Sequence, residues 1–230
     1  MGKSSDAVIL KAKRIAAHVL DAEPDDVEFA GGLCSVKGTN RKLSLFEAAQ
    51  AGLTRADLPT DLKGALTAQH EEHFRHAGFP YGAAVAEVEI DPDTGALELV
   101  GYAAVDDVGR AINPLVLQGQ THGGIAQGVG QALWETCHFD PETGQPLTAS
   151  FMDYAMPRAD MLPRYDTMLS EVPAPSNPLG VRAGGEGGTT PALASTMNAV
   201  VDALSHLGIT HMDMPATPLR IWQAIRQALN

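Results

Sequence analysis

A tight turn between two β-type runs limits the possible folds of this chain more than any other pattern. Apolar and polar side chains alternate in residues 84–90, and a mostly apolar run follows at 96–105. Between them lies Asp91-Pro-Asp-Thr-Gly95, in which the proline presets φ and the final glycine readily takes a positive φ. A period of two places successive side chains on opposite faces of a strand. The sequence therefore predicts an antiparallel hairpin with one buried face.

Helical patterns surround this hairpin. Apolar residues recur at helical spacing in residues 6–22, and Ser44-Leu-Phe-Glu47 fits a capping box that opens a helix over residues 45–52. Thr190-Pro191 and Thr217-Pro218 each pair an N-cap residue with a proline at the first helical position, so each predicts a further helix. The last helix is expected to bury one apolar stripe, formed by Leu219, Trp222, Ile225 and Leu229.

These elements predict an α+β fold, in which antiparallel strands pack against several helices. Short strands around Gly31-Gly32 complete an N-terminal α+β lobe, which we assign to residues 1–80. A C-terminal lobe is assigned to residues 81–230. Within it, residues 145–180 contain six of the chain's 15 prolines and are expected to wrap around the lobe as extended chain. Packing gaps there are expected to be filled by Met152, Met156, Met161 and Met168.

Residues 115–134 fit a helix although they contain five glycines. Each glycine costs a helix about 1 kcal/mol relative to alanine, so the pattern needs a reason. Gly119 and Gly123 lie four residues apart, as do Gly124 and Gly128, which lines bare backbone along a helix face. Close packing of another helix and close approach of a ligand both account for such a face, and both remain open.

Charge and cysteine content exclude several function classes. Lys+Arg total 16 and Asp+Glu 28, so the net charge is −12, which argues against nucleic-acid and anionic-membrane partners because both need clustered basic residues. No apolar run approaches the roughly 20 residues of a membrane span. The N-terminus lacks an apolar leader, and we expect a cytoplasmic protein. Cys34 and Cys137 form no C-x-x-C, which excludes a Cys-ligated iron–sulfur cluster within this chain and predicts reduced, mostly buried thiols.

The segment Gly180-Val-Arg-Ala-Gly-Gly-Glu-Gly-Gly-Thr-Thr-Pro191 surrounds one carboxylate, Glu186, with glycines. Such glycines permit unusual backbone conformations and let a ligand come close. A cation site would want more oxygen ligands than Thr189 and Thr190 offer. The segment therefore favours a positioned base over a cation site or a solvated turn.

Several other polar groups have two interpretations each. Arg182 could pair with a cofactor phosphate or hold Glu186, or it could form a salt bridge elsewhere. His122 could contact a ligand or be a satisfied packing residue. Asp106-Asp107 could be an acid pair or a turn cap. Three histidines at three-residue spacing could offer two metal ligands, although an exposed polar segment is the simpler interpretation; they are His70, His73 and His76.

Four motifs occur in order along the chain, and together they resemble one family. They are Phe79-Pro-Tyr-Gly82, Asp107-Val-Gly-Arg-Ala-Ile-Asn-Pro114, the glycine-rich run from Gln118 to Gly130, and Gly180-Val-Arg-Ala-Gly-Gly-Glu-Gly-Gly-Thr189. The sequence resembles the C-terminal portion of the molybdenum-binding (large) subunit of the xanthine dehydrogenase / aldehyde oxidase / aerobic carbon monoxide dehydrogenase family.

The resemblance implies a molybdopterin-dependent oxidoreductase that hydroxylates an electron-poor carbon with oxygen derived from water. In that family a pyranopterin dithiolene holds the molybdenum, so no metal-ligating side chain is expected here. The family's glutamate, which takes a proton from the Mo–OH group, matches Glu186. The positions that match its cofactor-binding residues are Gln120, Gly124, Gln127, Gly184, Gly185 and Gly187.

The family's subunit is several times longer than this chain, so the chain is either a separate subunit or a fragment of a longer one, and we predict a cofactor site at an interface. The resemblance implies that the rest of the molybdenum subunit, a 2Fe-2S iron–sulfur subunit and an FAD subunit are partners. The cofactor, in its cytosine dinucleotide form, would lie between chains and act on a small-molecule substrate. A non-catalytic cofactor-binding or assembly module remains an alternative, as does an unrelated hydrolase that uses Glu186 and a histidine.

Overall fold

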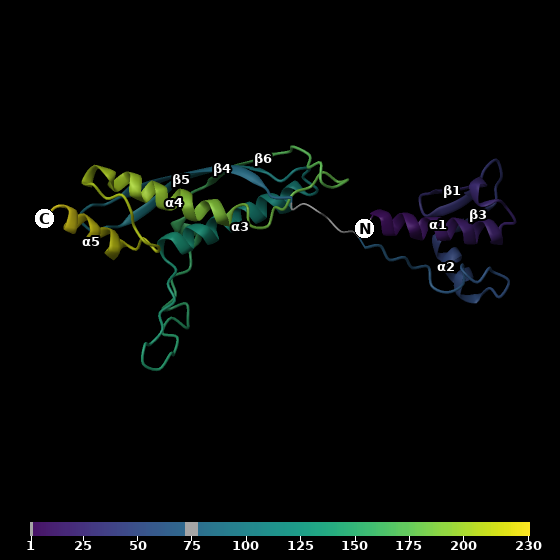
Figure 1. Cartoon of the computed structure of the whole chain (residues 1–230), viewed down its shortest axis with the longest axis horizontal. Coiled ribbons are helices and arrows are strands. Elements are labelled where there is room, and N and C mark those ends of the chain that lie inside the picture. The colour runs from purple at the N-terminus through teal and green to yellow at the C-terminus, as the bar shows by residue number, and fades with distance from the viewer. Residues whose placement is uncertain (1, 72–77) are drawn as a thin grey trace. The chain divides into compact units, whose positions relative to one another are not determined.

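The computed structural model describes residues 2–71 and 78–230, and the chain divides into two compact units, Met1–His73 and Phe74–Asn230 (Figure 1). Each unit is treated by itself below. The predicted lobe boundary between residues 80 and 81, and the roles assigned to the two lobes, stay predictions. Among the described residues, no helix combines the length and the apolar character needed to cross a membrane.

The N-terminal unit packs helices against a three-stranded antiparallel sheet of order β1-β2-β3. Its elements are α1 (Gly2–Val19), η1 (Pro24–Asp26), β1 (Val27–Ala30), β2 (Leu33–Val36), β3 (Lys42–Ser44) and α2 (Leu45–Thr54). The predicted capping box is present: Ser44 Oγ accepts from the Glu47 amide at 3.2 Å, and Glu47 Oε2 accepts from the Ser44 amide at 2.8 Å. Cys34 is buried in the core of this unit, as expected.

The C-terminal unit also combines helices with a three-stranded sheet, of order β4-β5-β6. Its elements are β4 (Tyr81–Ile90), β5 (Leu97–Asp107), α3 (Pro114–Leu133), η2 (Ala159–Met161), β6 (Tyr165–Ser170), α4 (Thr189–Leu204), η3 (Ser205–Leu207) and α5 (Pro218–Ala228). β4 and β5 form the predicted antiparallel hairpin. β6 runs parallel to β5 and lies in the segment that was expected to be extended chain only. The α+β class is confirmed, with one parallel pair added.

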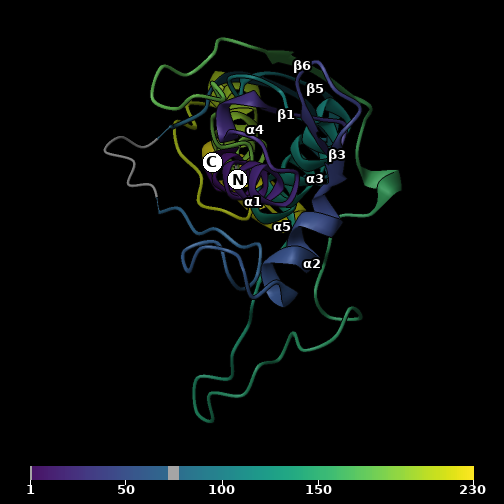
Figure 2. The same cartoon turned by 90° about the vertical axis from the view of Figure 1, so that its right-hand side faces the viewer.

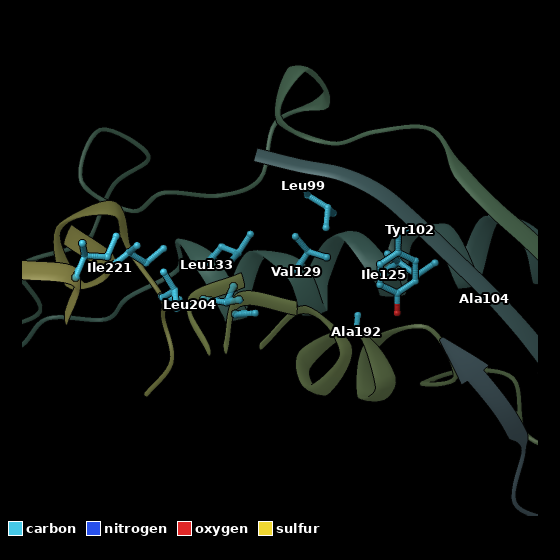
Figure 3. Close-up of a cluster of buried hydrophobic side chains, with 13 residues drawn as sticks. Leu99, Tyr102, Ala104, Ile125, Val129, Leu133, Ala192, Leu204 and Ile221 are labelled. Carbon is cyan, nitrogen blue, oxygen red and sulfur yellow. The ribbon is translucent and has the colours of Figure 1, made fainter. Parts of the chain in front are cut away.

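Helices α3 and α4 pack on one face of this sheet and enclose the main core of the unit (Figure 3). The close-up shows Leu99 and Tyr102 of β5 directed toward Ile125 and Val129 of α3, with Ala192 of α4 close by. These side chains are buried and apolar apart from one hydroxyl. The core therefore fixes the position of the glycine-rich helix relative to the end of β5.

Two helix predictions need correction. Helix α4 begins at Thr189, with Gly188 as its N-cap and no side-chain cap bond, so Thr190 is not the N-cap. In α5 the buried positions are Ile221 and Ile225, while Leu219 is 61% exposed. The predicted stripe was wrong because the helix packs on the (i, i+4) isoleucine pair. Of the other three residues of the predicted stripe, Ile225 is buried, whereas Trp222 and Leu229 are exposed.

The segment between α3 and β6 projects away from the sheet and helices of its unit in two perpendicular views (Figures 1 and 2). Met152 is 92% exposed and Met156 is exposed as well, and so is Met168, which lies in β6 and not in this segment. The prediction that these three fill packing gaps was wrong, whereas Met161 is partly buried. Cys137 is exposed too, contrary to the expectation of mostly buried thiols. A projecting loop has no second layer to pack on, which is why its apolar side chains face solvent in this chain.

Candidate active site

Four of the five glycines of α3 lie on two faces, and the first of these faces packs on α4; the fifth, Gly130, lies against Glu135 and Pro157. A Cβ added to Gly124 would lie 2.9 Å from the Thr189 amide nitrogen. One added to Gly128 would lie 2.6 Å from the Thr189 carbonyl oxygen and 2.7 Å from the Ala192 Cβ. Contacts this short are closer than any side chain can come. Helix packing therefore explains Gly124 and Gly128, and the predicted cofactor role of Gly124 stays untested.

The second glycine face of α3 is open. A Cβ added to Gly119 or Gly123 would meet no described atom within 4 Å beyond its own helix and chain neighbours. Gly185, in the loop before α4, has the same freedom. Open glycine backbone on a helix and on a facing loop is what close approach of a ligand requires. Gly119 and Gly123 therefore fit the close approach of a ligand better than the close packing of another helix.

The loop that carries Glu186 is tied to this helix. The Gln120 side chain donates from Nε2 to the Gly185 carbonyl oxygen at 2.7 Å, and Thr189 Oγ1 donates to Gln127 Oε1 at 3.3 Å. A Cβ on Gly184 would lie 2.8 Å from Leu117 Cδ2, so this part of the loop lies against α3. Two predicted helix residues and the predicted loop, separated by more than fifty residues, therefore lie together.

Glu186 lies in this loop between Gly185 and Gly187. Its carbonyl oxygen accepts from the Thr190 amide at 3.2 Å, so the loop continues directly into α4. Its side chain is exposed in this chain. The partial burial expected for a base is not provided by the described residues.

A buried acid lies beneath the loop. Asp106, next to the end of β5, is 5% exposed and accepts from Thr121 Oγ1 at 3.4 Å. Burial raises the pKa of the Asp106 carboxyl, and the Thr121 hydrogen bond opposes part of that rise. Its neighbour Asp107 is the turn cap that the sequence suggested, because Asp107 Oδ1 accepts from the Gly109 amide at 2.8 Å. Sequence inspection named the Asp106-Asp107 pair but not the burial of Asp106, because two adjacent acids before a turn carry no pattern of burial.

Arg182 and His122 have structural partners. The Arg182 guanidinium lies 4.7 Å from the Tyr81 ring centroid, and its Nε is 3.8 Å from Asp107 Oδ1. It therefore forms a salt bridge away from Glu186, as the simpler interpretation held. His122 Nε2 is 2.7 Å from Thr167 Oγ1, which fits a satisfied packing residue.

Metal-ligating side chains do not gather in the described parts of the chain. Within residues 2–71 and 78–230, no group of three or more His, Cys, Asp or Glu side chains could hold a metal ion. Of the histidine trio, His73 and His76 lie outside the described residues.

The chain is similar in sequence to known proteins. Residues 2–163 match the model of the molybdopterin cofactor-binding domain. The chain is 38% identical over 232 residues to the 6-hydroxypseudooxynicotine dehydrogenase complex subunit gamma of Paenarthrobacter nicotinovorans, covering 99% of this chain and 28% of that protein. It is 33% identical to the carbon monoxide dehydrogenase large chain of Hydrogenophaga pseudoflava, covering 94% of this chain and 27% of the relative.

A solved structure shows the same fold. The chain superimposes on quinoline 2-oxidoreductase from Pseudomonas putida 86 with a TM-score of 0.79 and 33% identity, covering 98% of this chain and 29% of that one. The chain thus spans less than a third of the length of the relatives it matches. With the family model matched over more than half of its residues, the chain belongs to the molybdopterin cofactor-binding domain family of molybdenum-dependent oxidoreductases.

Proposed function

We propose that this chain forms one wall of the cofactor site of a molybdenum hydroxylase, with Glu186 as the general base. The observation that carries the proposal is the Gln120–Gly185 hydrogen bond of 2.7 Å. It joins the glycine-rich helix to the glutamate loop, beside the open backbone of Gly119, Gly123 and Gly185.

The residues present fit a molybdenum–pyranopterin group. The described residues contain no metal-ligating cluster, which suits a metal that is held by an organic dithiolene. Exposed amide side chains at Gln120 and Gln127 and open glycine backbone can hydrogen-bond a polar ring system at close range. When bound, the group supplies the redox chemistry and the reactive oxygen. The cytosine dinucleotide form of the pterin is part of the proposal.

The protein's own residues then have separate tasks. Gln120 fixes the loop from the helix side, and the remaining donors of Gln120 and Gln127 orient the group. Gly184, Gly185 and Gly187 let it approach the backbone. Glu186 accepts a proton at its carboxylate oxygens, a step that contributes typically 10²–10⁴-fold to a rate. Because Glu186 is exposed here, another polypeptide must exclude water from the site.

The lengths of the relatives support a shared site. The chain spans 28% of a protein described as a complex subunit gamma, and 27% of one described as a large chain. We therefore propose that the remaining portion of the molybdenum subunit supplies the facing wall, and that separate subunits carry 2Fe-2S clusters and FAD. The substrate would be a small molecule with an electron-poor carbon, and a cytoplasmic location is part of the proposal.

The test of the base is Glu186→Gln in the assembled complex, with Glu98→Gln on the outer part of β5 as the matched control. We expect the Glu186 variant to lose about 10²–10⁴-fold in kcat and to keep its molybdenum content, because only proton transfer is removed. Unchanged turnover would favour a non-catalytic cofactor-binding or assembly module. Turnover that survives complete removal of the metal would favour a hydrolase.

The shared site has its own test. The chain is purified alone, and bound molybdenum and pterin are measured. We expect little of either, because one wall leaves most of a cofactor in solvent. A stoichiometric and tightly held pterin on the isolated polypeptide would contradict the proposal.

A further inference from the structure

Asp106 lies where β4, α3 and the loop that carries Glu186 come together. Gly82 of β4 lies against it, since a Cβ added there would be 2.7 Å from Asp106 Oδ1. Thr121 of α3 donates to Oδ2 at 3.4 Å. A Cβ on Gly187 in the loop would lie 3.8 Å from all three atoms of the carboxyl group. A carboxyl side chain that is 5% exposed therefore sits where strand, helix and loop meet.

The residues that surround Asp106 are sequence neighbours of Gln120 and of Glu186, the two main residues of the proposed site. Thr121 follows Gln120 in the sequence, and the Gln120 side chain holds the loop by its hydrogen bond to the Gly185 carbonyl oxygen. Gly187 follows Glu186. A Cβ on the next residue, Gly188, would come 2.3 Å from the Thr121 carbonyl oxygen, so the loop lies directly on this turn of α3. The loop is thus hydrogen-bonded to Gln120 at Gly185, and at Gly188 it packs on Thr121, the residue that donates to Asp106.

We propose that Asp106 is a positioning residue for Glu186, which it fixes over α3 through Gly187 and Thr121. The inference rests on the proposed function in that Glu186 is taken as the base. Asp106 itself does not reach the surface where a ligand would bind.

The charge state of Asp106 matters to this role. Burial raises the pKa of its carboxyl, and the groups around it offer no compensating positive charge. Gly82 faces it from β4 and Thr121 from α3, while Leu169 of β6 is its neighbour across the sheet. The titratable groups nearby are the Tyr102 hydroxyl, whose pKa Asp106 helps to raise, and the Glu186 carboxyl one residue beyond Gly187. Because burial disfavours the charged form, the Asp106 carboxyl holds its proton more tightly than an ordinary aspartate does.

Amide hydrogen exchange on the full chain tests the positioning role without any cofactor. We expect Asp106→Ala to speed exchange at residues 185–188 by up to about tenfold, the factor for loss of its hydrogen bond with Thr121, on which Gly188 of the loop packs. Asp106→Asn keeps the shape and the hydrogen bonding and should restore exchange to within about threefold of wild type. Asp93→Asn, in the exposed 91–95 turn, is the control and should change nothing at the loop.

A merely structural role would give a different result. In that case Asp106→Ala would speed exchange equally in the core stretch 125–129 of α3, and this would overturn the proposal, as would unchanged exchange at residues 185–188. If Asp106→Ala does not fold, Thr121→Val removes one partner at nearly constant volume. It should raise exchange at the same four amides by a smaller factor, and no change there would contradict the proposal.

A spectroscopic titration gives a second readout. The amide signals of Glu186 and Gly187 should shift with pH around a midpoint above the ordinary range of an aspartate. That step should vanish in Asp106→Asn and persist in Asp93→Asn; persistence in both would assign it to another group and overturn the inference. If Glu186→Gln kept full turnover, the proposed function would fail while these measurements would still show whether Asp106 holds the loop.

Discussion

Alanine at two glycines of α3 should have different effects on the stability of the C-terminal unit. Gly123 faces open space, and a Cβ on Gly128 would lie 2.6 Å from the Thr189 carbonyl oxygen. Alanine gains about 1 kcal/mol over glycine in a helix interior. Gly123→Ala should gain most of this. In Gly128→Ala the same gain is opposed by an overpacking cost of about 1–3 kcal/mol, because a backbone atom of α4 has to move.

The expected net effects can be separated by unfolding measurements. Gly123→Ala should raise the melting temperature by about 2–4 °C, and Gly128→Ala should leave it unchanged or lower it by a similar amount or more. Both tryptophans of the chain, Trp134 and Trp222, lie in the C-terminal unit. Tryptophan fluorescence during heating therefore reports on this unit alone. Shifts of the same sign and size in both variants would refute the division of α3 into a packed face and an open face.

The Gly123→Ala variant also tests whether a ligand binds at the open face of α3. Gly123 lies on the open side of the helix, so an added methyl group there should weaken cofactor retention in the assembled complex even though it stabilises the free chain. Molybdenum content after dialysis is the measurement. Full retention in Gly123→Ala would mean that the cofactor does not approach this face.

Three further predictions concern single contacts. Ser44→Ala removes the capping box with Glu47 and should destabilise the N-terminal unit by about 0.5–2 kcal/mol, measured by circular dichroism in urea, with no change in tryptophan fluorescence. Because burial raises the pKa of Asp106, the folded state binds the proton more tightly than the unfolded one, and stability is lost as the pH rises above the ordinary value of 3.8. Asp106→Asn should therefore gain stability relative to wild type as the pH increases in a urea titration series, and a constant difference would contradict this sign. Gln120→Ala removes the 2.7 Å bond to the Gly185 carbonyl and should speed amide exchange in the loop by about tenfold; unchanged rates would mean that the bond does not hold it.

Local patterns in the sequence predicted most of the secondary structure. The 91–95 turn, the capping box at Ser44 and the helix opening at Thr217-Pro218 all form as expected, because each depends on contacts between residues close in the chain. β6 was missed because its pairing with β5 joins residues about sixty positions apart, and its own six residues carry no clear alternation.

The candidate site, like the secondary structure, could be predicted from the sequence only in part. Glu186 stands out in the sequence because glycines flank it on both sides, and a flexible backbone around one carboxylate is a local property. Which glycines of α3 face α4 and which face open space could not be read from their spacing, since both pairs are four residues apart. The α4 backbone decides it by filling the space beside Gly124 and Gly128.

The amino-acid sequence by itself determined where the chain turns, which segments become helices, and which acid is set in a bare glycine loop. Only the tertiary structure decided that Gln120 holds this loop, that Asp106 is buried beneath it, and that Arg182 pairs with Asp107 instead of with Glu186. The physical reason is that hydrogen bonding and burial depend on which distant segments the core brings together, and no local pattern records that choice.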